Sequence, residues 1–260
     1  MDKIHHHFSR IAQKYKDIRT TDLEPILFIK KKLEGLSEVE AADVGSGVGR
    51  YDIELFNHLG KRLSLTCIDS NDDMLKELTK NLKEHKIENF NTIKAQADFL
   101  PLSNNFLDCV VTFNAIHHFE LSGFLQEASR ILKSSGTLFI YTRLRSQNKE
   151  NIWGRFFPRF YEKESRLKEL NELKEILIGI PTLKYESIEY FKFKRMANLE
   201  WLIAQAMNHH YSTFSLYDEE EFNESLKKFE ENIARHFKDS NQIVWDDEYT
   251  MLVIRKNQGE

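Results

Sequence analysis

The feature that most constrains the fold is an alternation of apolar runs with amphipathic stretches, which begins near residue 40 and continues to residue 143. Short apolar runs joined by amphipathic helices predict a parallel sheet with helices on both faces. Right-handed crossovers then fix much of the strand order, and a ligand site is expected beside the first strand, where that order reverses. A strand and its turn are expected at 40–47, further strands at 63–70, 91–99, 107–116 and 136–143, and helices at 50–59, 71–85 and 123–133.

Composition limits the class of protein. With 260 residues, of which 41% are hydrophobic, the chain can bury a sizeable core, most simply as one domain with insertions. Its 37 Lys and Arg against 41 Asp and Glu give a net charge of -4, which excludes a general electrostatic attraction to nucleic acid. No apolar run approaches the roughly 18 residues that a spanning helix needs, so we expect a cytoplasmic protein without a membrane span.

A glycine-rich loop follows the first predicted strand. Gly45, Gly47 and Gly49 alternate in AADVGSGVGR, and chains that bind NAD and chains that bind S-adenosylmethionine both begin their nucleotide site in this way. A dinucleotide fingerprint would need a further glycine where this chain has Arg50. Asp69 ends the second strand, where its carboxylate can accept both ribose hydroxyls of a nucleoside, but NAD enzymes place an acid similarly.

The later motifs separate the two cofactor families. Asp98 in the third strand stands where class I S-adenosylmethionine-dependent methyltransferases have an acid, and GxGxG preceded by Asp43 resembles their motif I. LDCVVTFNAIHHF resembles their motif IV, and QEASRILKSSGTLFI resembles the helix, glycine turn and fifth strand that follow. Over residues 41–143 the chain thus resembles this family, most closely the type 11 branch that includes the ubiquinone and menaquinone biosynthesis methyltransferases. The resemblance implies S-adenosylmethionine as cofactor and a doubly wound, seven-stranded, mostly parallel α/β sheet of the Rossmann-like type.

The resemblance also implies roles for individual residues. Asp98 would accept the adenine amino group while Phe99 packs on the ring. Asp43 and the backbone around Asn114 would receive the methionine ammonium end, although Asp43 could instead cap loop amides. The complete set of expected cofactor-binding residues is Asp43, Gly45, Ser46, Gly47, Asp69, Ser70, Met74, Ala97, Asp98, Phe99 and Asn114.

Two histidines follow the fourth strand. His117 and His118 come at its carboxyl end, so at least one should face the cleft, where it could take a proton or orient an acceptor. The alternative is that one ring bonds loop backbone and the other is solvated. A second pair, His209 and His210, could meet the first at a metal site, but no carboxylate at ligand spacing supports this, so no metal is expected.

A leading helix, FSRIAQKY, folds over the cofactor in relatives, which implies that Tyr15 lies near the sulfonium end. Packing of this ring between two helices is an equal alternative. The candidate catalytic residues are His118, His117, Arg143 and Tyr15.

The segment after the fifth strand combines arginines with aromatic residues. Arg143 extends from a strand end at the expected cleft, where its guanidinium would fork onto a carboxylate or phosphate of an anionic acceptor. The alternative is that the arginines of this segment pair with nearby acids such as Glu162 and Glu164. Arg and aromatic side chains together could also stack RNA bases, which the net acidity of the chain disfavours. The other arginines of the segment are Arg145, Arg155 and Arg159.

We expect a single domain with an N-terminal helical flap and a helical cap. An insertion of this kind typically covers the active site as a lid. Its aromatic residues form either the core of the lid, which we favour, or contacts in the cleft; they are Trp201, Tyr211, Phe214 and Tyr217. The expected parts are N-terminal helices at 1–36, a cofactor-binding core at 37–143, the cap at 144–182 and 196–240, and the last two strands at 183–195 and 241–256.

The sequence therefore predicts an S-adenosylmethionine-dependent methyltransferase that acts on a small molecule, with an anionic acceptor as the narrower form of the prediction. A tRNA-modifying methyltransferase would use the same cofactor motifs, and a catalytically silent subunit would bind the cofactor without turnover. No DPPY-type or NPPY-type tetrapeptide follows the fourth strand, which argues against amino methylation of DNA bases.

Overall fold

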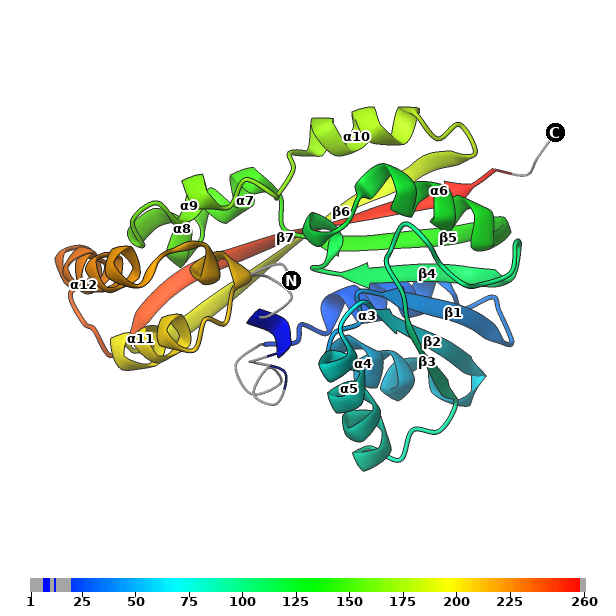
Figure 1. Ribbon diagram of the computed structural model, residues 1–260, viewed down its shortest axis with the longest axis horizontal. Helices are drawn as coiled ribbons and strands as arrows, with labels where there is room; N and C mark the ends of the chain where they lie inside the picture. Colours follow the sequence, from blue (N-terminus) through cyan, green and yellow to red (C-terminus); the bar gives the residue numbers. More distant parts are fainter. Residues whose placement is uncertain (1–6, 10–11, 13–19, 258–260) are drawn as a thin grey trace. The chain divides into compact units, whose positions relative to one another are not determined.

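The computed structural model describes residues 7–9, 12 and 20–257, so the predicted contact of Tyr15 lies outside the described residues. The chain divides into two compact units, which are drawn with their elements labelled in Figure 1. What we call the sheet unit consists of Thr20–Thr142, Leu170–Phe191 and Thr250–Glu260. What we call the helical unit consists of Met1–Arg19, Arg143–Glu169 and Lys192–Tyr249.

Seven strands form one sheet in the order β3-β2-β1-β4-β5-β7-β6 (Figure 1). The first five strands pair in parallel, and β7 pairs antiparallel with β5. The direction of the crossovers reverses between β1 and β4, so the expected switch point lies at their carboxyl ends. The predicted doubly wound, mostly parallel sheet is confirmed. The strands are β1 (Val39–Val44), β2 (Leu63–Asp69), β3 (Phe90–Lys94), β4 (Leu107–Phe113), β5 (Leu132–Thr142), β6 (Leu183–Ala197) and β7 (Ile243–Lys256).

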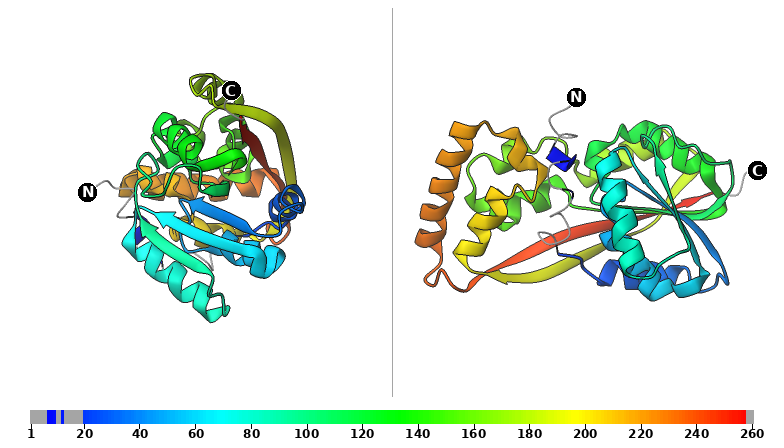
Figure 2. Two further views of the ribbon diagram at one scale, coloured as in Figure 1. Left: turned by 90° about the vertical axis from the view of Figure 1, so that its right-hand side faces the viewer. Right: turned by 60° about the horizontal axis from the view of Figure 1, so that its bottom comes forward.

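Helices cover both faces of the sheet. Helix α4 contacts α3 and α5, whereas α6 contacts α10, and Figure 2 shows α4 and α6 on opposite sides of the strands. This arrangement follows from right-handed crossovers on either side of the switch point. The helical elements of the sheet unit are α3 (Glu24–Lys32), α4 (Arg50–Leu59), η2 (Gly60–Arg62), α5 (Asp72–Glu84), η3 (Ile116–His118), α6 (Leu121–Ile131) and α10 (Leu170–Ile178).

Local sequence determines where the first helices of the sheet begin. Gly49, with a φ of 79°, directly precedes α4, and this left-handed backbone favours glycine. The side chain of Asn71 accepts the N–H groups of Asp73 and Met74 and so caps α5. Met74 is buried, which places this expected cofactor residue in the packing of α5.

The strand interiors are apolar, and the two cysteines belong to them. Cys67 on β2 and Cys109 on β4 are both buried and both carry free thiols. Burial raises the pKa of Cys109 to about 12, with a smaller contribution from Asp108, so this thiol stays protonated at physiological pH. Both thiols act as small apolar groups, as the sequence predicted.

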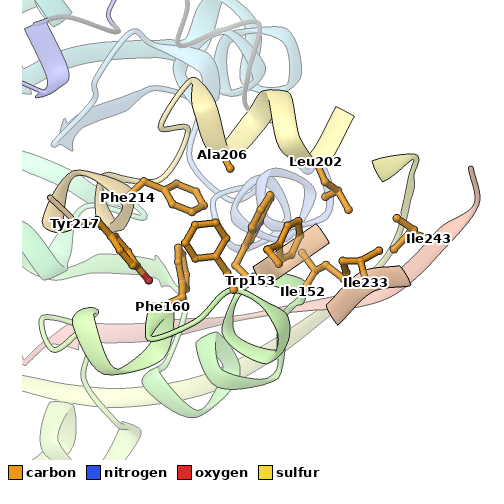
Figure 3. Packing of buried hydrophobic residues seen from close by; sticks show 11 residues of the cluster. Ile152, Trp153, Phe160, Leu202, Ala206, Phe214, Tyr217, Ile233 and Ile243 are labelled. Atoms are coloured by element: carbon orange, nitrogen blue, oxygen red, sulfur yellow. The ribbon is translucent and has the colours of Figure 1, made fainter. Parts of the chain in front are cut away.

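An aromatic core holds the helical unit together (Figure 3). Trp153 stacks on Phe229 at a centroid distance of 5.1 Å and meets Phe214 edge-on at 5.3 Å. Phe214 and Tyr217 belong to this core, as the favoured interpretation of the cap aromatics expected, whereas Trp201 is 44% exposed. The helical elements of this unit are α7 (Arg145–Glu150), α8 (Ile152–Phe156), α9 (Phe160–Lys163), α11 (Leu199–Met207), η4 (Ser212–Leu216) and α12 (Glu219–His236).

The limits of the helical unit differ from the predicted cap. Residues 170–182 belong to the sheet unit, because α10 contacts α6 and the hydroxyls of Ser129 and Thr182 lie 2.6 Å apart. Strand β6 ends two residues later than expected and β7 begins two residues later, and each strand contributes residues to both units. In the part of the chain that the structure describes, no helix is long and apolar enough to cross a membrane.

Arg143 forms a buried ion pair inside the helical unit. Its guanidinium donates to the carboxylate of Asp247, to the Tyr249 hydroxyl at 2.7 Å and to the Tyr211 hydroxyl at 3.1 Å. Burial alone would lower the pKa of Arg143, but the charge of Asp247 together with Tyr211 and Tyr249 outweighs it and raises that pKa, so the guanidinium stays charged. Arg143 thus pairs with an acid, as the alternative interpretation expected, although this acid, Asp247, is not one of the nearby examples. Its contact with an anionic acceptor stays a prediction, which these internal bonds weaken.

The other arginines of the segment also have partners within the helical unit. Arg159 pairs with Glu221 at 2.7 Å, while Arg145 lies over the ring of Tyr161 and Arg155 over that of Phe156. Glu164 pairs with Arg166, which lies outside the predicted set.

Replacing Asp247 by Ala leaves the buried Arg143 without its carboxylate. Loss of one partner of a buried ion pair costs about 3–5 kcal/mol, so we expect the free energy of unfolding in urea to fall by that amount. The matched control is Asp246→Ala, because Asp246 forms an exposed pair with Lys192 and its loss should leave the unfolding midpoint unchanged. Equal effects of the two substitutions would contradict this account of the pair.

Candidate active site

The glycine loop after β1 is held against β2 and against the segment that follows β4. Gly45 and Ser46 donate their N–H groups to the carbonyl of Ile68 at 2.8 and 3.0 Å. A Cβ on Gly45 would lie 2.5 Å from the Cβ of Ala115, so a larger residue would push these segments apart. The first glycine is therefore required by packing within the protein.

Gly47 serves a different purpose from Gly45. Its φ of 57° is left-handed, but no atom lies within 4 Å of the place where a Cβ would stand. Its N–H donates to the Asp69 carboxylate at 2.9 Å. The backbone at Gly47 thus presents an open surface, onto which a ligand can settle closely.

Asp69 at the end of β2 connects two loops. One carboxylate oxygen accepts the N–H of Gly47 and the other accepts that of Asn71, each at 2.9 Å. Asp69 and the following Ser70 are half-buried. Because each oxygen of a carboxylate can accept more than one hydrogen bond, a carboxylate at this strand end is suited to hydroxyl donors.

An acid and an aromatic ring lie together after β3. Asp98 is exposed, Phe99 is 77% exposed, and the preceding Ala97 is buried. A Cβ on Gly123 would lie 2.7 Å from that of Asp98, so this glycine lets the start of α6 approach Asp98. The carboxylate and the ring face are accessible to a planar ligand that carries an amino group.

Asp43, two residues before the first glycine, is a buried carboxyl with a second buried carboxyl beside it. Asp43 is 2% exposed and Asp52, in the first turn of α4, is fully buried. Desolvation raises the pKa of Asp43 well above its usual range, and the charges of Asp52 and Asp69 raise it further. A cationic group would relieve this cost, so Asp43 suits a ligand ammonium.

The chain turns sharply at the carboxyl end of β4. Asn114 has a φ of 55° and donates its N–H to the Tyr141 carbonyl at 2.7 Å. His117 and His118 follow on η3, with ring centroids 4.0 Å apart; His117 is half-buried and His118 is exposed. The structure places both rings beside the strand end that the sequence predicted, and their chemical role stays a prediction.

The second histidine pair lies in the helical unit and has contacts there. His209 Nδ1 is 3.2 Å from the Ser215 hydroxyl, and the buried His210 bonds the Gln205 carbonyl and packs on Trp153. Over residues 7–9, 12 and 20–257, no three His, Cys, Asp or Glu side chains form a group that could hold a metal ion.

Two residues near the loop were missed in the sequence. Arg50 donates to the Thr20 carbonyl and the Thr21 hydroxyl, each at 2.7 Å, and so holds the segment that leads into α3. Asp52 shares a helical face with Leu55, Phe56 and Leu59, at spacings of three, four and seven residues. That spacing could have identified Asp52 as a buried acid.

The part of the chain that carries the candidate site is similar to known proteins. Residues 42–140 match a family model described as a methyltransferase domain, of type 11. The chain is 29% identical over 140 residues to the ubiquinone/menaquinone biosynthesis C-methyltransferase UbiE of Blochmanniella floridana, covering 51% of this chain and 55% of that protein. UbiE of Serratia proteamaculans is 28% identical over 100 residues, covering 38% of this chain and 40% of that protein. The chain thus spans about half the length of these relatives.

Solved structures with low sequence identity share the fold. YcgJ of Bacillus subtilis has a TM-score of 0.66 and 15% identity, covering 90% of this chain and 99% of that protein. The cyclase SpnF has a TM-score of 0.61 and 15% identity, covering 90% of this chain and 80% of that protein. A third structure is phosphoethanolamine N-methyltransferase 2 of Haemonchus contortus in complex with phosphomonomethylethanolamine and S-adenosylhomocysteine. It has a TM-score of 0.56 and 16% identity, covering 90% of this chain and 52% of that protein. Residues 42–140 thus match a methyltransferase domain of type 11, and the sheet that contains them has the Rossmann-like fold of these solved structures.

Proposed function

We propose that this protein transfers a methyl group from S-adenosylmethionine to a small-molecule acceptor and releases S-adenosylhomocysteine. The observation that carries the proposal is the arrangement at the carboxyl ends of β1, β2 and β3. There the chain has an open glycine surface at Gly47, the carboxylate of Asp69, and the accessible pair Asp98 and Phe99.

Each of these features fits one part of the cofactor. Asp69 would accept the ribose hydroxyls, Asp98 the adenine amino group, and Phe99 would pack on the adenine ring. The buried carboxyl of Asp43 would receive the ammonium end. When bound, the cofactor supplies an electrophilic methyl group on a positively charged sulfur.

The remaining task of the protein is to orient an acceptor and to exclude water. Methyl transfer is an in-line displacement, so the chain needs no covalent intermediate, and positioning supplies most of the rate. Where the accepting atom carries a proton, His118 or His117 would remove it as a general base. Their position after β4, beside the glycine loop at Ala115, supports this role.

The type of acceptor is inferred from the relatives and from residues outside the matched domain. The similar proteins named UbiE are C-methyltransferases of ubiquinone/menaquinone biosynthesis, which supports a small molecule. An anionic acceptor is the narrower proposal, with Arg143 as the candidate contact. The bond from Arg143 to Asp247 already neutralises that guanidinium, so we place less weight on the anion.

Two other functions would use the same domain. A tRNA-modifying enzyme would bind RNA with strong salt dependence. A catalytically silent cofactor-binding subunit would bind S-adenosylmethionine without turnover. The net acidity of the chain disfavours the tRNA-modifying enzyme. The carboxylates and histidines at the strand ends disfavour the silent subunit.

Incubation with S-adenosylmethionine carrying a labelled methyl group, together with a fractionated cell extract, separates these functions. We expect label in the low-molecular-weight fraction, which would also supply the product for identification. Label that RNase releases would replace the proposal with the tRNA enzyme. Tight cofactor binding without transfer to any fraction would replace it with the silent subunit.

Replacing Asp69 by Ala removes the proposed acceptor of the ribose hydroxyls and the anchor of Gly47. Two hydrogen bonds to a charged carboxylate contribute about 3 kcal/mol together, so we expect the Kd for S-adenosylhomocysteine to rise about 100-fold. Calorimetric titration measures this. The control is Asp72→Ala, because the exposed Asp72 pairs with Lys94 at the surface and should leave the Kd unchanged. An unchanged Kd in Asp69→Ala would remove Asp69 from the site.

Replacing His118 by Ala is expected to lower kcat for the labelled acceptor about 100-fold or more if its accepting atom must lose a proton. The Kd for S-adenosylhomocysteine should stay the same, because the ring is not proposed to touch the cofactor. His117→Ala tests the neighbouring ring, and His85→Ala, at the exposed residue that follows α5, is the control. If neither His117→Ala nor His118→Ala changes kcat, the general-base proposal fails while methyl transfer stands.

A further inference from the structure

Two carboxyl groups are buried directly beneath the glycine loop. Asp43 is the last residue but one of β1 and is 2% exposed, and Asp52 lies in the first turn of α4 with no exposed surface. A Cβ on Gly49 would lie 3.4 Å from one carboxylate oxygen of Asp52, which places this group immediately under the loop. Within residues 7–9, 12 and 20–257, no amide, hydroxyl or basic group hydrogen-bonds to either oxygen of Asp52 or to Oδ1 of Asp43.

Among the residues that the structure describes, the groups that interact with this pair carry no positive charge. The neighbours of Asp52 are the Asp43 carboxyl on β1 and the Cys67 thiol on β2. The charge of Asp69 at the end of β2 also repels that of Asp43. From α5 the side chain nearest to the loop at Gly49 is the apolar Leu78. Two ionised carboxylates in such surroundings would be costly, because burial removes their hydration and their charges repel.

One proton held between the two carboxyls removes most of this cost. Desolvation is the main cause that raises the pKa of Asp52 to about 6, and it raises the pKa of Asp43 in the same direction. The two groups therefore titrate as a pair. Asp52 is fully buried and has the Asp43 carboxyl as a neighbour, so it is suited to act through Asp43.

We propose that Asp52 is a positioning residue for the cofactor, which holds a proton against Asp43 in the free protein and releases it when the cofactor ammonium binds at Asp43. The inference rests on the proposed function, since it requires that S-adenosylmethionine binds here. When the ammonium binds, the O–H bond of the protonated carboxyl breaks and the proton passes to the solvent. The ammonium charge replaces the proton as the partner of the Asp43 carboxylate, so the site gains one cation and loses one proton.

A purely structural role for Asp52 gives a different expectation. An acid in the first turn of a helix is stabilised by the helix dipole, which requires the ionised form at neutral pH and releases no proton on binding. The two roles therefore differ in the number of protons exchanged when ligand binds and in the pH dependence of the free protein.

The first experiment is calorimetric titration of the full chain with S-adenosylhomocysteine, which keeps the ammonium end, at pH 6 in phosphate and in a buffer of high ionisation enthalpy. We expect the apparent enthalpy to differ between the buffers by the heat of up to about one released proton per site, and the difference to shrink by pH 8. In Asp52→Asn the amide can donate to Asp43 at every pH, so the release should disappear while binding persists. Asp239→Asn, at an exposed aspartate whose bond to the Asn241 N–H an amide oxygen can keep, is the matched control.

The second experiment follows urea unfolding of the free protein between pH 5 and pH 8. A carboxyl whose pKa is raised by folding stabilises the folded state below its unfolded pKa, near 4, and this stability is lost as pH rises through its folded pKa, about 6 for Asp52. We expect the free energy of unfolding of the wild-type protein to fall over this range. In Asp52→Asn it should fall less, and at pH 8 it should be higher than in the wild type.

The outcomes separate this inference from the proposed function. Binding of S-adenosylhomocysteine by the wild type without proton release would overturn the role of Asp52 and leave the proposed function intact. The same pH dependence of unfolding in Asp52→Asn and wild type would also overturn it. Absence of any binding by the wild type would contradict the proposed function itself.

Discussion

The hydrogen bond from the Gly47 N–H to the Asp69 carboxylate is the contact on which the rest of the candidate site depends. It joins the loop after β1 to the end of β2, while the second oxygen of the same carboxylate holds the N–H of Asn71. Asn71 in turn caps α5. One side chain therefore fixes the open face of the loop and the start of the next helix, and two neighbouring parallel strands deliver it to the same edge of the sheet.

Much of the sheet could be predicted from sequence because its signals are local. Each strand is a short apolar run, each turn carries glycine or a capping residue, and the crossover rule supplies the order. The limits of the helical unit could not be predicted in the same way. The apolar face of α10 is visible in the sequence, but its pattern does not say that α6, and not another cap helix, covers it.

The candidate site shows the same division. Asp69 and Asp98 could be located because each stands near the end of a predicted strand. The partner of Arg143 could not, because Asp247 lies 104 residues further along the chain and the nearby Glu162 and Glu164 were the obvious choices by sequence distance. Asp52 was missed for a different reason, since a charged residue on an apolar helical face contradicts the rule by which buried faces are recognised.

The two long strands have a consequence for how this fold can be recombined. Ile243–Tyr249 of β7 belong to the helical unit and Thr250–Lys256 to the sheet unit, and β6 is divided in the same manner. The helical unit is therefore not one continuous insertion, and a chimaera with a relative would need junctions inside both strands. At such a junction a slip of a single residue turns every later side chain to the opposite face of the sheet. Exchange of the helical unit between relatives is thus restricted to variants that keep the register of both strands through their junctions.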